Sequence, residues 1–242
     1  MTLVYIFLAC ILLLLSLKRL FQTRKFRNLP PGPPSFPIIG NLLQLKVMLL
    51  AGTDTSAVTL EWAMSNLLNH LEILKKAKNE LDIYVGHQLV EELDISKLPY
   101  LQSIVYELHP AAPLLLPRLA SEDCTIGEFH VPKNTILLVN AWDIHTDPKL
   151  WNDPTHFKPD RFQKESEANK ILSFGLGKRA CPGANLAQGT VSLTIALLIQ
   201  CFEWKQINSE KIDMTEGKGL TVSKKYPLEA MCQCRNGLIR SI

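Results

Sequence analysis

A glycine-rich loop with one cysteine, placed directly before a long apolar stretch, constrains this chain most. The loop at residues 174–183 reads FGLGKRACPG, and apolar residues dominate from Ala184 to Phe202. Glycines allow a tight loop whose backbone approaches a flat ligand closely. A thiolate at a helix N-terminus is stabilised by the positive end of the helix dipole and by nearby N–H groups. The pattern therefore predicts a buried helix preceded by a cysteine that can bind iron.

This F-G-x-G-x-R-x-C-x-G run resembles the haem-binding signature of cytochromes P-450. The alternative is a glycine-rich loop around a core cysteine, and three further elements in the family's order argue against it. The resemblance implies that Cys181 is the metal ligand, binding the iron of haem b (iron protoporphyrin IX), because an axial thiolate favours O–O cleavage. It also implies that Arg179 pairs with a haem propionate. Phe174, Gly175 and Gly183 would complete the cofactor loop.

The segment AGTDTS at residues 51–56, inside an apolar helical stretch, resembles the family's distal oxygen-activating motif. The resemblance implies that Gly52 leaves room for dioxygen. Asp54 beside Thr55 would relay protons, a task that needs positioned groups in a dry pocket. The alternative for such a string is a helix cap or turn, since these residues compete for backbone hydrogen bonds.

Two arginines match further family positions. The segment PDRF at residues 159–162 resembles the P-E-R-F element, whose arginine braces a glutamate and an arginine of a neighbouring helix. Arg161 is therefore expected to be structural. Arg118 follows a proline-rich stretch, where related proteins place an arginine that binds a haem propionate. The alternative for Arg118 is a plain surface residue.

The chain departs from the family pattern after Glu107. The family has E-x-x-R, in which residues three apart share a helix face, but here Glu107 is followed by Leu108, His109 and Pro110. The flanking sequences match so well that a three-residue deletion, removing the arginine, is inferred. Because Pro110 biases His109 away from helical dihedrals, the helix should end near Glu107. If Glu107 and Arg161 still meet, their network is incomplete.

A second departure lies at Lys46 and Val47. Residues 40–46 normally lead into the family's first helix, yet here they run directly into the distal helix. The resemblance implies that the intervening half of the fold is missing, including the helix that covers the haem and most residues that choose a substrate. Exposed large apolar side chains forfeit roughly 1.5–3 kcal/mol each. We therefore expect the chain to fold poorly alone. We also expect the loss of the E-x-x-R arginine and the loss of half of the fold to oppose turnover.

The N-terminal region has the pattern of a membrane anchor. Residues 3–17 are almost unbroken in apolar character, and a basic cluster follows from Lys18 to Arg27. Residues 1–21 are therefore predicted to span the membrane, with the positive end in the cytosol. A cleaved secretory signal is the alternative, but its charges should precede the apolar run. Residues 22–46, with LPPGPP at 29–34, form a stiff basic linker, and residues 47–242 form the haem-binding domain.

The predicted fold is mainly α with small β-sheets, which is the C-terminal half of the cytochrome P-450 fold behind an anchor helix. Two helical stretches are expected from Val47 to about Lys78, and a shorter helix from Leu93 to Glu107. A few short strands should lie between Pro110 and Asn140. Prolines leave no helix of useful length from Trp142 to Phe162, and the chain should end in a hairpin.

Charge and cysteine content exclude other classes. The net charge is only +3 and the basic residues cluster near the anchor, so no nucleic-acid partner is expected. The six cysteines lack the C-x-x-C spacing of zinc sites and the density of a small secreted scaffold. A reduced domain on the cytosolic face of the endoplasmic reticulum membrane fits best.

The resemblance implies a monooxygenase, an oxidoreductase that inserts one atom of dioxygen into a substrate C–H bond. Its partners would be an NADPH-dependent P-450 reductase, membrane lipid and a small phenolic substrate. The retained segments are most similar to plant enzymes that hydroxylate flavonoid or isoflavonoid rings, such as isoflavone 2'-hydroxylase. Two alternatives stay open. The chain could bind haem or a partner at the membrane without catalysis, or it could be the functionless product of a shortened transcript or faulty gene model.

Overall fold

A computed structural model of the chain describes residues 39–163 and 170–235, together with positions 5, 7, 11–14, 16 and 36. The chain divides into two units, Met1–Ala51 and Gly52–Ile242. In the first unit, most of the predicted anchor at 1–21 and most of the linker at 22–46 lie outside the described residues. The described positions between 5 and 16 are helical and exposed.

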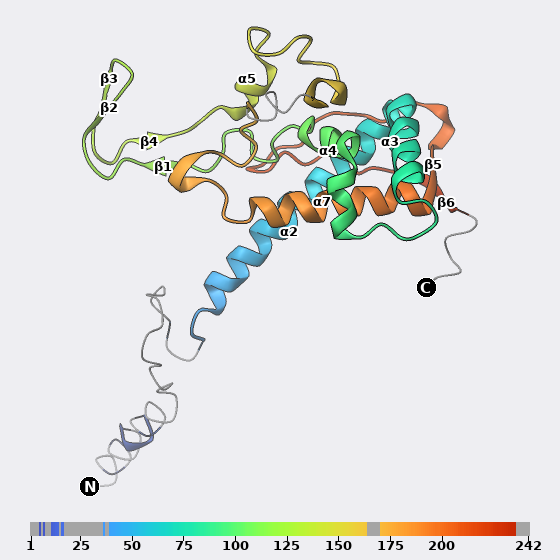
Figure 1. Cartoon of the computed structure of the whole chain (residues 1–242). Helices are drawn as coiled ribbons and strands as arrows, with labels where there is room; N and C mark the ends of the chain where they lie inside the picture. The colour runs from blue at the N-terminus through green and yellow to red at the C-terminus, as the bar shows by residue number, and fades with distance from the viewer. Residues whose placement is uncertain are drawn as a thin grey trace. The chain divides into compact units, whose positions relative to one another are not determined.

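Helices outweigh strands in the second unit (Figure 1). The α-helices are α2 (Leu42–Asn69), which begins in the first unit, α3 (Leu71–Tyr84), α4 (Pro99–Tyr106), α5 (Ala141–Thr146) and α7 (Ala184–Cys201). The described part of the chain also contains four short 3-10 helices, η1 (Glu92–Lys97), η2 (Pro159–Gln163), η3 (Gly177–Arg179) and η4 (Ile207–Ser209).

Among the described residues, six short strands pair into three antiparallel two-stranded sheets. Strands β1 (Arg118–Leu119) and β4 (Ile136–Leu137) pair, β2 (Cys124–Ile126) pairs with β3 (Phe129–Val131), and β5 (Phe202–Gln206) pairs with β6 (Ala230–Cys234). Figure 1 shows the β2–β3 hairpin projecting beyond the β1–β4 pair. The mainly α fold with small sheets, predicted from the sequence, is confirmed.

The hydrophobic core lies where the C-terminal half of α2 meets α3, α4 and α7. Leu67, Leu81, Leu101 and Ile195, one from each helix, are fully buried within it. Gln200 is buried too, and its side chain bridges the backbone at Val90 and Gln88 with hydrogen bonds of 3.0 and 2.7 Å. A buried amide needs such partners, because an unpaired one would cost about 1–3 kcal/mol. Among the described residues, α7 is apolar and long enough to cross a membrane, yet its packing is that of a core helix.

Helix α4 ends as the sequence predicts, but its beginning differs. The helix stops at Tyr106 with Glu107 as its C-cap, three residues before Pro110. The single helix expected from Leu93 to Glu107 is instead two, η1 and α4, with Leu98 between them. Leu98 precedes Pro99, and a residue before proline is disfavoured in the helical region. The carboxylate of Glu80 accepts hydrogen bonds from the first amides of α4 and so caps it.

Helix α2 also begins earlier than expected. The sequence predicts a helix from Val47, whereas α2 starts at Leu42 and runs for 28 residues through Lys46 and Val47 without interruption. Residues 42–50 contain no proline or glycine that would stop it. His70 separates α2 from α3, and its Nδ1 lies 2.8 Å from the Asn66 carbonyl.

The loop between β5 and β6 runs along α2. Asn69 hydrogen-bonds to the backbone of Ile212, and the indole of Trp62 donates to the Val222 carbonyl at 2.7 Å. Lys224 is 7% exposed, and its ammonium group donates to the Ser65 hydroxyl at 3.1 Å. These bonds join residues more than 140 positions apart, so the C-terminal loop is a fixed part of the second unit.

Candidate cofactor site

The cysteine loop is a tight turn closed by its own backbone. The amide of Cys181 donates to the Phe174 carbonyl at 2.8 Å, and the amide of Ala180 donates to the Gly177 carbonyl at 3.1 Å. Gly175 and Gly177 have φ of +67° and +68°, a conformation that costs little only for glycine. A Cβ on Gly175 would also lie 3.6 Å from Cδ1 of Leu115. The two glycines of the sequence motif are therefore explained by the left-handed backbone conformation that the turn requires at both positions.

Cys181 lies immediately before α7, with its thiol open to solvent. Helix α7 begins at Ala184 with Gly183 as its N-cap, and Cys181 is a free, exposed cysteine. A Cβ at Gly183 would lie 4.0 Å from the sulfur, so a longer side chain there would crowd it. Across the described parts of the chain, no three histidine, cysteine or carboxylate groups gather into a metal site. Within those described residues, Cys181 therefore stands apart from any cluster of further metal-ligating side chains.

Arg118 contacts the cysteine loop directly. Its Nη2 donates a hydrogen bond of 2.8 Å to the carbonyl of Arg179, which brings two predicted cofactor-binding arginines together. Arg118 belongs to β1, so the sheet and the loop are joined at this point. The contact uses the backbone of Arg179 and leaves its side chain exposed. Two guanidinium groups near the cysteine suit an anionic ligand edge such as a carboxylate pair.

The surroundings of Cys181 are apolar and exposed. Phe174 and Leu176 in the loop are 38% and 70% exposed, and Leu186 in the first turn of α7 is 76% exposed. Large apolar side chains exposed together mark a surface that binds something apolar. A flat apolar macrocycle with carboxylates at one edge and a metal at its centre matches these apolar, basic and thiol groups. The residues present therefore fit one face of a haem.

The predicted distal residues lie on α2, in its exposed first half. Thr55 and Asp54 fall within one helical turn, and the Asp54 carboxylate accepts a hydrogen bond of 3.0 Å from the hydroxyl of Thr221. Gly52 is helical, and a Cβ there would meet nothing within 4 Å. The Gly52 carbonyl accepts the hydroxyl of Ser56 at 2.7 Å. The segment at residues 51–56 is thus helical and forms neither a helix cap nor a turn. Asp54 is hydrogen-bonded to the C-terminal loop.

Glu107 and Arg161 do meet, despite the altered E-x-x-R sequence. Arg161 Nε lies 2.9 Å from Glu107 Oε2, with the two side chains 14% and 8% exposed. The N–H of Nε is not aligned for a hydrogen bond, so this contact is an ion pair. The other Glu107 oxygen accepts the amide of Lys158 at 2.8 Å. Arg161 also donates to the carbonyls of Asn152, Asp153 and His156.

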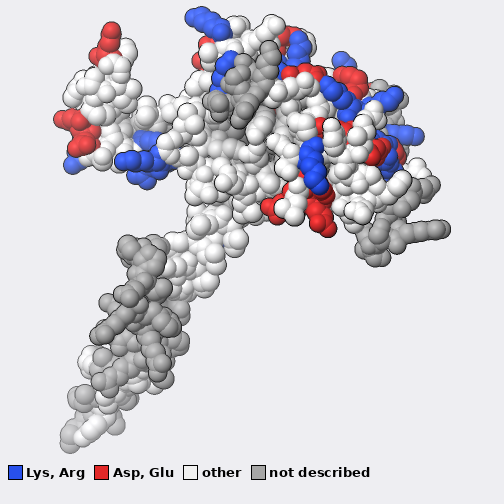
Figure 2. All heavy atoms as spheres, in the orientation of Figure 1, with Lys and Arg blue, Asp and Glu red and all other residues white. Residues whose placement is uncertain are grey.

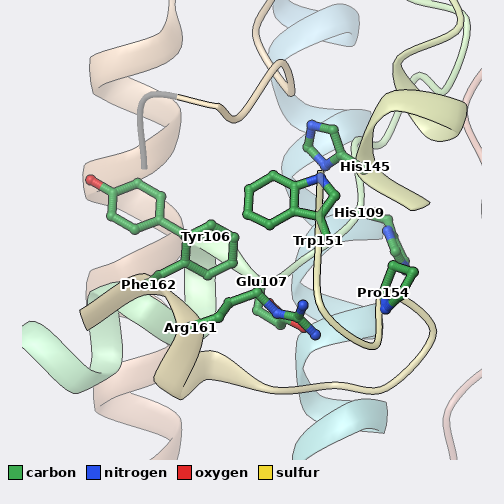
Figure 3. Close-up of a pocket in the computed structure, with 8 residues that line it drawn as sticks. All are labelled: Tyr106, Glu107, His109, His145, Trp151, Pro154, Arg161 and Phe162. Atoms are coloured by element: carbon green, nitrogen blue, oxygen red, sulfur yellow. The ribbon is translucent and has the colours of Figure 1, made fainter. Parts of the chain in front are cut away.

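A small pocket lies beside this ion pair (Figure 3). Its lining includes two histidines, His109 and His145, together with the aromatic ring of Trp151. Desolvation lowers the pKa of His145 to about 4. Although the His109 residue is exposed by its surface area, desolvation of its ring against the pocket lowers its pKa, and the Arg161 charge adds to the shift. His145 Nε2 accepts the amide of Leu172 at 2.9 Å, which requires the neutral ring. Burial raises the pKa of Glu107, while the Lys158 amide and Arg161 oppose that shift.

The structure therefore brings some predicted residues together and leaves others apart. Arg118 joins the Cys181 loop, and Glu107 joins Arg161. Asp54 contacts Thr221 instead of another predicted residue. Sequence reasoning missed Thr221 and His145, because neither stands in a motif and both act across long sequence separations. The glycines and prolines near Thr221 and His145 in the sequence indicate only that these residues lie in or beside loops.

The fold and the cysteine loop together define a haem-thiolate class of protein, and the chain belongs to the cytochrome P450 family. The family model described as cytochrome P450 matches residues 44–230. The chain is 69% identical over 196 residues to cytochrome P450 81E8 of Medicago truncatula, covering 79% of this chain and 39% of that relative. It is 66% identical over 190 residues to isoflavone 3'-hydroxylase of the same plant, covering 77% of this chain and 38% of that relative.

A solved structure supports the same assignment. A zebrafish cytochrome P450 solved with abiraterone has a TM-score of 0.78 and 29% sequence identity, over 87% of this chain and 50% of its own. The chain thus spans about two fifths of the length of the curated relatives and half of this solved chain. The second unit therefore has the conformation of part of a complete cytochrome P450.

Proposed function

We propose that the second unit carries the thiolate half of a haem monooxygenase site, with Cys181 as the iron ligand. The observation that carries this proposal is the exposed thiol of Cys181, which lies in the glycine loop before α7 and is flanked by apolar side chains. Haem b, when bound, would supply activation of dioxygen for insertion of one oxygen atom into a C–H bond. Membership in the cytochrome P450 family supports the haem assignment.

Each predicted residue has a role in this proposal. Phe174, Gly175 and Gly183 shape the loop and keep space at the sulfur. Arg118 and Arg179 hold the propionates, since both lie where the sheet meets the loop. The role of the ion pair between Glu107 and Arg161 is to hold the segment before the loop in place.

Gly52, Asp54 and Thr55 are proposed for the opposite side of the haem. Gly52 carries no side chain, so it leaves room for dioxygen, and Asp54 and Thr55 move protons between solvent and the reacting oxygen. The hydrogen bond from Thr221 fixes one carboxylate oxygen of Asp54 and leaves the other available. A positioned carboxylate is what a proton relay requires.

The substrate class, partner and location are proposals from kinship. Relatives include an isoflavone 3'-hydroxylase of Medicago truncatula and an isoflavone 2'-hydroxylase of Glycyrrhiza echinata, so a small phenolic ring is the proposed substrate. Electrons would come from an NADPH-dependent P450 reductase at the endoplasmic reticulum membrane. The domain division at residues 21 and 46, with the catalytic part facing the cytosol, remains part of the proposal.

The experiment is a reduced carbon-monoxide difference spectrum of the full chain in membranes, with Cys181→Ala for comparison. Cys232→Ala is a matched control, because Cys232 is also an exposed free cysteine but lies on β6. A thiolate-type Soret band that persists in the control and disappears in Cys181→Ala supports the proposal. A thiolate-type band that persists in Cys181→Ala, or that is absent from the unsubstituted chain despite good accumulation of protein, contradicts it.

A second candidate is haem or partner binding without turnover. The altered E-x-x-R sequence and the match to only 39% of a relative favour it. A thiolate-type spectrum without substrate oxidation in the presence of reductase would select this candidate. The third possibility, a shortened transcript or faulty gene model, predicts that messenger RNA sequenced across Lys46–Val47 and Glu107–Leu108 contains additional codons.

A further inference from the structure

Leu115 has a backbone conformation that leucine rarely adopts. It lies in the segment AAPLLLPR at residues 111–118, which we call the leucine segment, and its φ is +51°. In this left-handed region the Cβ of an L-residue comes too close to its own backbone. The other described non-glycine residues with positive φ are Asn134, Asp153 and Asn208, whose short polar side chains tolerate the region. A strained residue persists only where the surrounding structure fixes it, and such residues cluster at functional sites.

The leucine segment is held by backbone hydrogen bonds on both sides of Leu115. Before it, the Ala111 carbonyl accepts the amide of Val222 at 2.9 Å, and the Pro113 carbonyl accepts the amide of Trp142 at 3.1 Å. After it, the segment enters β1, which pairs with β4. The two ends of the segment are therefore fixed to other elements, and the chain between them cannot relax independently of those contacts.

The side chain of Leu115 lies against the cysteine loop. Its Cδ1 is 3.6 Å from the position that a Cβ on Gly175 would occupy, which is an ordinary van der Waals distance. Leu115 is half-buried, whereas its neighbours Leu114 and Leu116 are 44% and 55% exposed. The strained residue of the leucine segment is therefore the leucine whose side chain covers Gly175.

Gly175 is next to the hydrogen bond that closes the loop around Cys181. The carbonyl of Phe174, which forms the peptide bond to Gly175, accepts the amide of Cys181 at 2.8 Å. The leucine segment makes a second contact here, the hydrogen bond from Arg118 to the Arg179 carbonyl. Figure 2 shows few charged side chains between the β2–β3 hairpin and the body of the second unit, apart from one basic cluster. Apolar packing and a hydrogen bond to the backbone therefore join the segment to the loop.

We propose that Leu115 is a positioning residue, which holds the backbone of the cysteine loop and so fixes the place of the Cys181 sulfur. Packed against Gly175, its side chain keeps the Phe174 carbonyl within reach of the Cys181 amide. The fixed ends of the leucine segment maintain the strained backbone that this contact requires. The functional meaning of the contact rests on the proposed haem-thiolate site, whereas the positioning itself does not require haem.

The test is amide hydrogen exchange of the full chain in detergent-solubilised membranes, with and without Leu115→Asn. Asparagine tolerates the left-handed region, so this variant relieves the backbone and removes the apolar contact. We expect amides of residues 175–181 to exchange about fivefold faster, because the bond that closes the loop opens more often. Leu115→Met keeps an apolar side chain of similar size and should retain the original rate. Leu116→Asn is the matched control, since Leu116 is 55% exposed, and it should leave the loop unchanged.

Exchange in α7 separates a local effect from unfolding. Faster exchange confined to residues 175–181 supports the positioning role. Unchanged exchange with Leu115→Asn, or equal acceleration with Leu116→Asn, overturns it. Acceleration that extends through α7, together with a lower unfolding midpoint, also overturns it, because Leu115 would then be a general packing residue.

A second variant and a second readout complete the test. Leu115→Ala truncates the side chain and gives the same comparison if Leu115→Asn does not fold. In reduced carbon-monoxide spectra of the same samples, the thiolate-type share of the Soret band should fall with Leu115→Asn and recover with Leu115→Met. Absence of that band from the unsubstituted chain contradicts the haem site, while the exchange result still decides the role of Leu115.

Discussion

The helical core and the cysteine side of the second unit are built very differently. In the core, Leu67, Leu101 and Ile195 are fully buried and even the polar Gln200 is fully paired. On the cysteine side, Leu176 and Leu186 are at least 70% exposed, and the adjoining sheet has two residues per strand. The difference teaches that the buried contacts of this unit are concentrated between its helices, whereas the cysteine side leaves large apolar side chains exposed.

The largest effect should come from truncating the core. Ile195→Ala should lower the free energy of unfolding by roughly 2–5 kcal/mol, because it leaves a cavity at a fully buried position. Leu176→Ala should change it by less than about 0.5 kcal/mol, since that side chain is 70% exposed. Chemical denaturation followed by circular dichroism measures both. Equal losses would erase the distinction between the two regions.

Arg161 and Arg118 allow the helical side and the cysteine side of the second unit to be compared by single substitutions. Arg161→Ala should cost roughly 3 kcal/mol, because it leaves the carboxylate of Glu107 buried without its cation and three backbone carbonyls without their donor. Arg118→Ala on the cysteine side should cost about 1 kcal/mol or less, since one hydrogen bond is lost. The same denaturation assay compares them. A larger loss for Arg118→Ala would mean that the cysteine side carries the stability.

The half-buried His145, in the pocket beside the ion pair, predicts that the stability of the second unit is acid-sensitive. Because burial lowers the pKa of His145 to about 4, its contribution to stability is complete above the unfolded pKa of about 6.5 and is lost as pH falls toward 4. At about 1.36 kcal/mol per pKa unit, and allowing for partial exposure, the loss should reach roughly 2 kcal/mol.

His109 acts in the same direction, whereas Glu107, with its raised pKa, acts in the opposite one. His145→Gln keeps an acceptor for the Leu172 amide and should flatten the pH dependence between 6.5 and 4. His130→Gln on the exposed strand β3 is the control and should leave the slope unchanged. An unchanged slope with His145→Gln would contradict the assignment.

The smallest effect concerns the tie between α2 and the C-terminal loop. Thr221→Val removes the hydrogen bond to Asp54 and should cost about 0.5–1 kcal/mol, because the pair is partly solvated. Thr221→Ser keeps the hydroxyl and should recover most of that loss. Denaturation midpoints of Thr221→Val and Thr221→Ser measure this contribution. Equal midpoints would show that the Thr221 hydroxyl contributes nothing to stability.

Sequence reasoning reached the cysteine loop and the end of α4 because both depend on local chemistry. Glycines at 175 and 177 need left-handed dihedrals, and Pro110 limits the preceding helix. It missed the division at Leu98, where Pro99 ends one helix and begins the next. The contacts of Thr221, Lys224 and Glu80 were also missed. Those contacts are long-range, and no local pattern of residues encodes which partner they meet.

Amide hydrogen exchange of the full chain, read peptide by peptide, tests the contrast between the two regions most directly. Amides of α4 and α7 should be strongly protected, since they pack into the buried core. Amides of residues 114–119 and 134–138 should exchange orders of magnitude faster, because little covers them. Equal protection in both regions, or rapid exchange throughout α7, would contradict a stable core beside an uncovered cofactor side.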